Sequence, residues 1–283
     1  MHRTLIDCDT LAKHLGAPDW RIFDCRFDLG KPDLGGTQYW QGHIPGAIYA
    51  HLDRDLSAPV TPSSGRHPLP APETLAARCA SWGINARTQV IAYDQGNGMY
   101  AARLWWLLRW LGHERVAVLN GGLVEWTRVP SRPMSRDVVT VTPGALVPRL
   151  RTNWVVSTAE LEPLVGAGLA DQALCDARGA DRFAGQNETI DPVAGHVPGA
   201  SNMPFAGNLG PDGRFLSPAQ LRERWTQKLT DRSRTIMMCG SGVSACHNLL
   251  ALEHAGLSGA RLYAGSWSEW IRDPARPVAT GAG

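Results

Sequence analysis

The chain has 283 residues, of which 43% are hydrophobic and 19% are charged, the balance of a globular protein rather than of a disordered one. At roughly 100–200 residues per domain, this length predicts two domains. The net charge of +2 provides no strong field, so neither nucleic acid nor a membrane is predicted as a partner.

The N-terminus and the cysteines predict the compartment. The chain becomes acidic at Asp7, which is too early for a signal peptide. The most apolar helical stretch, Met99–Leu111, is interrupted by Arg103 and Arg109, so no membrane span is predicted. The six cysteines are widely separated, which is typical of reduced thiols and predicts a cytoplasmic protein.

Short apolar runs alternate with helical patterns along the chain. The predicted elements are, in chain order, a strand at 90–93, a helix from Met99, a strand at 116–119, a strand at 235–238, a helix at about 244–254 and a strand at 260–263. Strand, helix and strand joined by short turns indicate an α/β fold, a mostly parallel sheet with helices on both faces. Ligands bind at the carboxyl ends of strands in such sheets, and Asp94 and Cys239 are expected there.

One domain pattern occurs twice in the sequence. Three segments of the first half return in the same order: Asp24–Arg26 as Asp176–Arg178, Gly42–Ala47 as Gly195–Ala200, and Gly122–Trp126 as Ser266–Trp270. Two copies indicate a duplicated domain, since a solenoid needs at least three repeats.

A proline-rich stretch with little helical periodicity separates the two copies. Residues 129–152 are predicted to be a linker, with one short strand at Val138–Val141. The two domains are accordingly predicted at 1–128 and 153–283.

The segment Cys239–Ala245 follows a predicted buried strand and opens a helix. Its two glycines allow successive backbone amides to turn inward, and the helix adds its positive end. Such a cradle favours the thiolate of Cys239 over the thiol, and it suits an anionic sulfur attached to that cysteine. The backbone groups of the cradle belong to Gly240, Gly242, Val243 and Ser244. The other five cysteines are interpreted as structural.

This loop resembles the active-site loop of the rhodanese family, and its Cys-Gly-Ser-Gly-Val form is similar to the 3-mercaptopyruvate sulfurtransferase branch. The Gly-His-Ile/Val-Pro-Gly-Ala box, Asp-Ala-Arg and the terminal Gly-Ser-Trp-x-Glu-Trp also resemble that family, so the match covers both copies. The resemblance implies a two-domain sulfurtransferase without a cofactor or metal. A donor, 3-mercaptopyruvate or thiosulfate, would leave its sulfur on Cys239 as a persulfide. An acceptor such as cyanide, a small thiol or thioredoxin would remove it.

The resemblance also implies a donor-binding arginine. Arg182 matches the residue with which the family grips the anionic end of the donor, a task that suits a guanidinium group. An inert ion pair with Asp181 or Glu188 is the alternative interpretation. The second arginine of the mercaptopyruvate branch is missing, because its segment reads Glu188–Pro192 here. Weak donor binding is therefore expected, with Arg66 as a candidate substitute.

Ser241, His67 and Asp53 match a serine–histidine–aspartate set of the mercaptopyruvate branch. Such a relay polarises the donor carbonyl and handles the proton as the enolate leaves. The alternatives are an ordinary loop histidine and, for Asp53, a turn or a helix cap. The loop also lacks the basic residues with which thiosulfate-type rhodaneses neutralise a dianion, which favours 3-mercaptopyruvate as the donor.

In the first copy Asp94 stands where the second copy has Cys239. A carboxylate cannot form a persulfide, so the domain at 1–128 is predicted to be catalytically silent and the domain at 153–283 to be catalytic.

Other functions remain as alternatives. One is a thiosulfate:cyanide sulfurtransferase proper, and another is a non-catalytic sulfur-carrier or binding protein, against which the intact Cys239 argues. A cysteine phosphatase would need an arginine where Ala245 stands. Cys246 and His247 lack the spacing and the fourth ligand that a zinc site with Cys239 would require.

Overall fold

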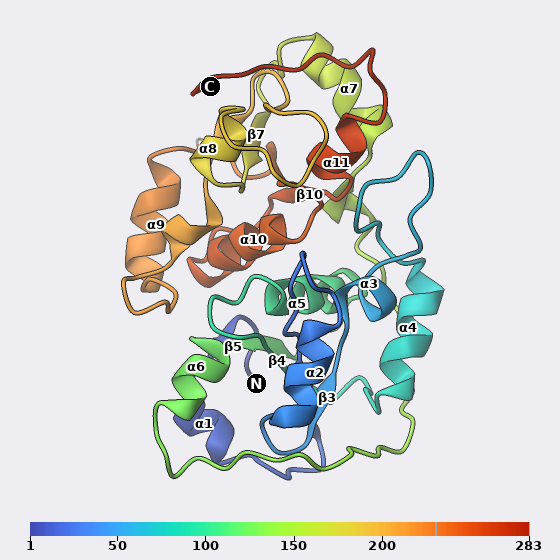
Figure 1. Cartoon of the computed structure of the whole chain (residues 1–283), viewed down its shortest axis with the longest axis vertical. Helices are drawn as coiled ribbons and strands as arrows, with labels where there is room; N and C mark the ends of the chain where they lie inside the picture. Colours follow the sequence, from blue (N-terminus) through green and yellow to red (C-terminus); the bar gives the residue numbers. More distant parts are fainter. Residues whose placement is uncertain (230, 283) are drawn as a thin grey trace. The chain divides into compact units, whose positions relative to one another are not determined.

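The structure, a computed structural model, describes residues 1–229 and 231–282, and it divides into two compact units (Figure 1). The first unit contains Met1–Ala58, Pro70–Arg151 and Pro211–Phe215. The second contains Pro59–Leu69, Thr152–Gly210 and the chain from Leu216. Each unit therefore includes one short segment from the other half of the sequence.

The first unit is built on a five-stranded sheet of order β1-β5-β4-β2-β3, in which every paired neighbour is parallel. Its strands are Leu5–Ile6 (β1), Trp20–Asp24 (β2), Ala47–Tyr49 (β3), Gln89–Tyr93 (β4) and Val116–Leu119 (β5). Its helices are Cys8–Ala12 (α1), Leu34–Gln41 (α2), Leu52–Asp55 (α3), Pro72–Ser81 (α4), Ala101–Trp110 (α5) and Gly122–Thr127 (α6).

Side chains that alternate along the central strands pack on both faces of this sheet, as the pleat of a strand requires. On one face, Ile22 and Ile91 belong to a buried cluster with residues of α1 and α6. On the other face, Phe23 packs against Trp82 at the end of α4, with ring centroids 5.0 Å apart. Helix α5, all of whose residues are buried, packs against β4 and β5.

The second unit repeats this topology in a parallel sheet of order β6-β10-β9-β7-β8. Its strands are Val155–Val156 (β6), Ala173–Asp176 (β7), Ser201–Asn202 (β8), Thr235–Met238 (β9) and Arg261–Tyr263 (β10). Its α-helices are Thr158–Gly166 (α7), Ala180–Phe183 (α8), Pro218–Thr226 (α9), Ser244–His254 (α10) and Ser266–Trp270 (α11), and short 3₁₀ helices lie at Thr152–Trp154 (η1) and Phe205–Asn208 (η2). Residues of α7, α8 and α11 form one buried cluster with β7 and β9, while α10 packs against β9 and β10.

The predicted fold class is confirmed, because both halves are parallel α/β sheets of identical strand order. The strand predicted at Val138–Val141 is wrong, since the structure describes no strand over these residues. Val138 is 73% exposed, and the bridge from nearby Ser135 to His43 is isolated. Isolated hydrogen bonds attach this stretch to the first unit. One of them runs from the N–H of Gly144 to the carbonyl of Ala80 at 2.7 Å.

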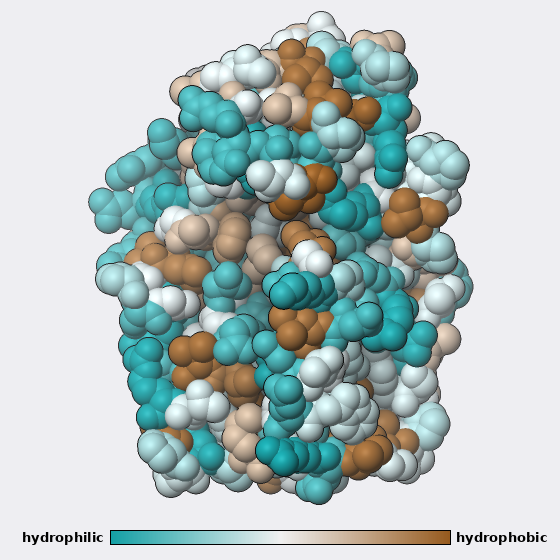
Figure 2. Space-filling view, in the orientation of Figure 1, coloured by the Kyte–Doolittle hydropathy of each residue, from teal (hydrophilic) through white to brown (hydrophobic). Residues whose placement is uncertain are grey.

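Hydrophilic side chains cover much of the face shown in Figure 2, where hydrophobic residues occur in small separate groups. The most exposed large hydrophobic side chains include Val147, Val138, Met1 and Val60. Within the described residues, no helix combines the length and the apolar character needed to cross a membrane.

Candidate active site

Cys239 directly follows β9, at the carboxyl end of the strand, and α10 begins at Ser244. The turn between them depends on Gly242, which has φ +76°. A Cβ at this position would lie 2.4 Å from the carbonyl oxygen of Ala264, so only glycine fits. This conformation brings the backbone N–H of Gly242 to 3.1 Å from Sγ of Cys239, and the N–H donates to the sulfur.

The first residues of α11 hold the backbone of the cysteine loop. Oγ of Ser266 accepts a hydrogen bond from the N–H of Cys239 at 3.1 Å. The N–H groups of Trp267 and Ser268 donate to the carbonyls of Cys239 and Gly240, at 3.0 and 2.8 Å. Ser266 has φ +54°, a left-handed conformation that is uncommon outside glycine. No sequence pattern singled out Ser266, although the repeat aligns it with a glycine, Gly122, and that mismatch was the available signal.

The first unit has the same framework around a carboxylate. Asp94 follows β4 as Cys239 follows β9, and Gly122 has φ +56°, close to that of Ser266. The carboxylate of Asp94 accepts hydrogen bonds from the backbone N–H groups of Gly96, Gly98, Tyr100 and Ala101. Burial raises the pKa of Asp94, and these hydrogen bonds oppose that shift. The inward-facing amides of this loop are therefore occupied by the side chain of Asp94.

Ser241 and His67 are in direct contact inside the second unit. Nδ1 of His67 lies 2.7 Å from Oγ of Ser241, and both residues are buried. His67 reaches this position because Pro59–Leu69 belongs to the second unit. Asp53 lies in the first unit on α3, where its backbone N–H donates to Nδ1 of His51, the N-cap residue. A single unit therefore contains the serine–histidine pair, and the role of Asp53 stays a prediction.

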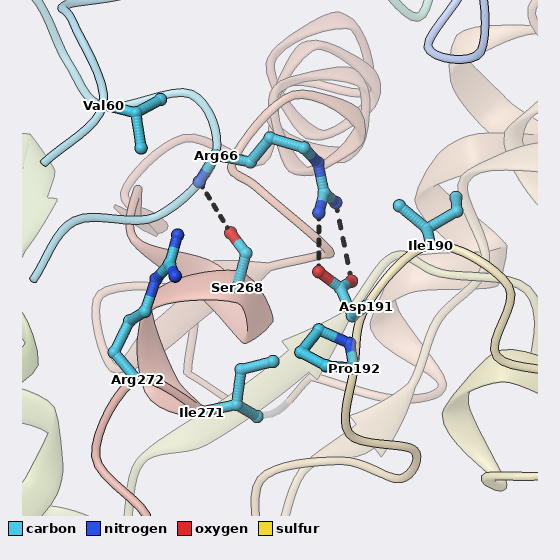
Figure 3. Close-up of a pocket in the computed structure, with 8 residues that line it drawn as sticks. All are labelled: Val60, Arg66, Ile190, Asp191, Pro192, Ser268, Ile271 and Arg272. Carbon is cyan, nitrogen blue, oxygen red and sulfur yellow. Dashed lines mark hydrogen bonds and ion pairs between the residues drawn. The ribbon is translucent and has the colours of Figure 1, made fainter. Parts of the chain in front are cut away.

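Arg66 and Arg182 both lie against Gly240. A Cβ at Gly240 would lie 3.3 Å from Nη2 of Arg66 and 3.7 Å from Nη2 of Arg182. The two guanidinium groups also bind the same carboxylate. Nη1 of Arg66 lies 2.6 Å from Oδ1 of Asp191, and Nη2 of Arg182 lies 3.0 Å from Oδ2 (the first contact is drawn in Figure 3). Asp191 is not among the predicted site residues, because the resemblance implies only an arginine in its segment.

Glu188 makes the ion pair that was the alternative interpretation of Arg182. Its two carboxylate oxygens accept from Nε and Nη2 of Arg182 at 2.9–3.1 Å. Burial by itself raises the pKa of Glu188, but hydrogen bonds from Arg182 and from the backbone of Asp191 and Ile190 outweigh it, so that the pKa is lowered. Glu188 is therefore a buried carboxylate that stays ionised.

A cavity of about 310 Å³ opens beside the Arg66–Asp191 ion pair (Figure 3). Its lining combines apolar and charged side chains, those of Val60, Arg66, Ile190, Asp191, Pro192, Ser268, Ile271 and Arg272. Ser268 connects this cavity with the cysteine loop, since its N–H donates to the carbonyl of Gly240 and its Oγ accepts from the N–H of Arg66 at 3.0 Å. Solvent and small anions can thus reach the ion pair.

The other cysteines lie in surroundings that oppose ionisation. Burial raises the pKa of four of them, to about 11 for Cys8, to about 12 for Cys79 and Cys175, and well above the ordinary range for Cys25. Cys246 donates its S–H to the carbonyl of Gly242 at 3.2 Å. The sulfur of Cys239 accepts a hydrogen bond from the backbone N–H of Gly242. The described residues contain no group of three or more histidine, cysteine or acidic side chains that could hold a metal.

Comparisons with known sequences agree with this architecture. The model of the rhodanese-like domain matches residues 7–129 and 157–273. A probable 3-mercaptopyruvate sulfurtransferase from Pseudomonas aeruginosa is 48% identical over 98% of both chains. A putative thiosulfate sulfurtransferase from Mycobacterium tuberculosis is 38% identical over 99% of this chain and 98% of its own. The relatives therefore include proteins named for either donor.

Solved structures of sulfurtransferases match nearly the full length of the chain. The 3-mercaptopyruvate sulfurtransferase from Leishmania major superposes with a TM-score of 0.82 at 33% identity, over 96% of this chain and 76% of that one. The enzyme of the same type from Escherichia coli gives 0.80 at 32% identity, over 95% of this chain and all of that one. With the domain matched twice and such relatives along nearly its full length, the chain belongs to the rhodanese family, and its predicted class, a two-domain sulfurtransferase, is confirmed.

Proposed function

We propose that the protein transfers sulfur from 3-mercaptopyruvate through a persulfide on Cys239. The observation that carries the choice of donor is the hydrogen bond between His67 and Ser241. Ser241 stands two positions after Cys239 in the loop. A serine–histidine pair can exchange a proton with a carbonyl or enolate oxygen. Breaking the C–S bond of 3-mercaptopyruvate produces an enolate, whereas thiosulfate has no carbonyl group.

The transfer begins when the Cys239 thiolate attacks the sulfur of 3-mercaptopyruvate. An S–S bond forms, the C–S bond breaks, and its electron pair remains on the carbon chain as the enolate of pyruvate. His67, acting through Ser241, supplies the proton that converts the enolate to pyruvate. The proton of the donor thiol leaves the persulfide and restores the proton on His67. The loop amides and the start of α10 stabilise the outer, anionic sulfur. Cyanide, a small thiol or thioredoxin then attacks that sulfur and releases Cys239 as a thiolate.

Arg66 and Arg182 are proposed to bind the donor carboxylate. Both guanidinium groups lie against Gly240, the residue after the nucleophile. Nη2 of Arg66 lies 3.3 Å from the position that a Cβ on Gly240 would take, which puts a charged donor beside the cysteine loop. Arg66 would in this way replace the arginine that is missing at 188–192.

The first unit is proposed to be catalytically silent. Asp94 stands at the end of β4 and takes four backbone N–H groups with its own carboxylate. That loop offers no thiol, and the Asp94 carboxylate already occupies these four amides.

Intact-protein mass spectrometry tests the persulfide. Incubation with 3-mercaptopyruvate should add one sulfur atom, about 32 Da, which a reducing agent removes. Cys239→Ser should abolish this adduct, and Cys246→Ser should retain it as the matched control on the same loop and helix. An adduct that persists in Cys239→Ser would refute the assignment.

Thiosulfate is the second candidate donor, and the M. tuberculosis relative favours it. Its two negative charges would meet Arg66 and Arg182, but it would have no use for the serine–histidine pair. Steady-state kinetics with both donors under the same conditions distinguish the two functions. A wild-type enzyme with the higher kcat/KM for thiosulfate would favour the second.

A further inference from the structure

We propose that Asp191 sets the charge of donor that the site accepts, by neutralising Arg66 and Arg182 and so discriminating against dianions. This inference rests on the proposed function, because it concerns the same donor site. It assigns a specificity-determining role to a residue of the segment 188–192, the segment in which the mercaptopyruvate branch is expected to carry an arginine.

The geometry makes Asp191 a bridge between two cations. One carboxylate oxygen binds Arg66 at 2.6 Å and the other binds Arg182 at 3.0 Å. The side chain of Asp191 is 2% exposed, against 27% and 20% for the two arginines. Both guanidinium groups also lie against Gly240. Each of them therefore contacts both Asp191 and the cysteine loop.

The charges of the surrounding cluster cancel. Three guanidinium groups and three carboxylates are connected by ion pairs, those of Arg66, Arg178 and Arg182 with those of Asp176, Glu188 and Asp191. A monoanionic donor such as 3-mercaptopyruvate can share a guanidinium group with Asp191. Thiosulfate brings a second negative charge to this ion-paired cluster, in which the Asp191 carboxylate repels it.

Asp191 could instead serve only to hold the segment 188–192 in place. Glu188 already does so, because its Oε1 accepts from the N–H groups of Ile190 and Asp191 at 2.9 and 3.0 Å. These bonds involve the backbone of Asp191 and survive a change of its side chain. A charge effect and a structural effect can therefore be separated with a nearly isosteric substitution.

The test compares Asp191→Asn with the wild type for both donors. One carboxylate charge disappears from the donor site, so the ratio of kcat/KM for thiosulfate to that for 3-mercaptopyruvate should rise about tenfold, mainly through a lower KM for thiosulfate. Asp191→Glu keeps the charge and should keep the wild-type ratio. Asp181→Asn is the matched control, since Asp181 is exposed and binds Asn187 and the backbone of Arg182 rather than a guanidinium group.

A binding measurement keeps this inference separate from the proposed catalysis. In the Cys239→Ser background, calorimetry should show thiosulfate binding about tenfold more tightly once Asp191→Asn is added. Tighter thiosulfate binding supports the charge role of Asp191, and absence of a persulfide in the wild type refutes the proposed function. The two inferences can therefore fail separately. Equal changes for both donors in Asp191→Asn, or unchanged thiosulfate affinity, would overturn the inference.

Discussion

Nδ1 of His67 and Oγ of Ser241 are 2.7 Å apart, although 174 residues separate them in the chain. The contact forms because the segment between α3 and α4 leaves the first unit and packs with the second. The histidine thereby arrives beside the cysteine loop, whose own residues include no base. A titratable side chain is thereby placed in contact with Ser241, two positions after Cys239 in the loop.

Replacement of His67 should therefore affect the two donors differently. His67→Ala should lower kcat/KM for 3-mercaptopyruvate on the order of the 10²–10⁴-fold seen when an acid–base group is lost, and it should affect thiosulfate much less. Steady-state kinetics with each donor measure this difference. His67→Gln provides the control, because glutamine can still hydrogen-bond Ser241 but cannot carry the proton. Equal losses for both donors in His67→Ala would mean that the histidine only supports the structure.

Arg182→Ala should weaken the binding of both donors, since each presents an anionic end to the same guanidinium group. The loss of one charge-assisted hydrogen-bonding group predicts a fall in kcat/KM of roughly ten- to a hundredfold, visible mainly in KM. Arg66→Ala should act in the same direction. The two effects should not be additive in the double variant, because both arginines share Asp191. Unchanged kinetics in Arg182→Ala would mean that Arg182 does not bind the donor and only forms an inert ion pair with Glu188.

The hydroxyl of Ser266 should contribute to stability through the cysteine loop. Ser266→Ala leaves the buried N–H of Cys239 without its acceptor, which costs about 1–3 kcal/mol in the free energy of unfolding. Ser266→Gly removes the same hydroxyl but relieves the strain of φ +54°, so its loss should be smaller by about 1 kcal/mol. Chemical denaturation of both variants measures the two effects. A glycine variant that is less stable than the alanine variant would contradict this account.

Alkaline pH should destabilise the protein through its buried thiols. Burial raises the pKa of Cys8 to about 11 and those of Cys79 and Cys175 to about 12. The unfolded chain releases these protons near the ordinary thiol pKa of about 8.5, while the folded protein retains them. Above about pH 8.5 the folded state therefore binds more protons than the unfolded state. The contribution of each thiol to the free energy of unfolding is complete below about pH 8.5 and is lost as the pH rises through the pKa of that thiol in the folded protein.

Thermal denaturation between pH 7 and pH 11 measures this dependence. Cys8→Ala should make the fall of the free energy of unfolding with pH less steep. The change should equal the contribution of one proton, at most about 1.4 kcal/mol per pH unit. The same slope in Cys8→Ala and in the wild type would show that this thiol ionises equally in both states.

Local patterns in the sequence predicted much of the fold and the nucleophile. The strands at 116–119 and 235–238 and the helix at 244–254 coincide with β5, β9 and α10, because buried strands and helix starts have short-range signatures. The spacing of Gly240 and Gly242 after a strand end likewise predicted the turn at Cys239 from backbone conformation alone. The valine-rich run at Val138–Val141 had the same signature and failed, since a strand also needs a partner with free backbone groups.

The sequence by itself determined which elements form, that they occur twice, and which cysteine follows a strand within a glycine turn. These features depend on residues that are neighbours in the chain. Only the tertiary structure decided that Asp191 joins Arg66 to Arg182, that Ser266 holds the N–H of Cys239, and that Pro59–Leu69 packs with the second unit. These contacts join residues from 9 to 208 positions apart, and their energy depends on burial and direction in the folded chain, which no local pattern records.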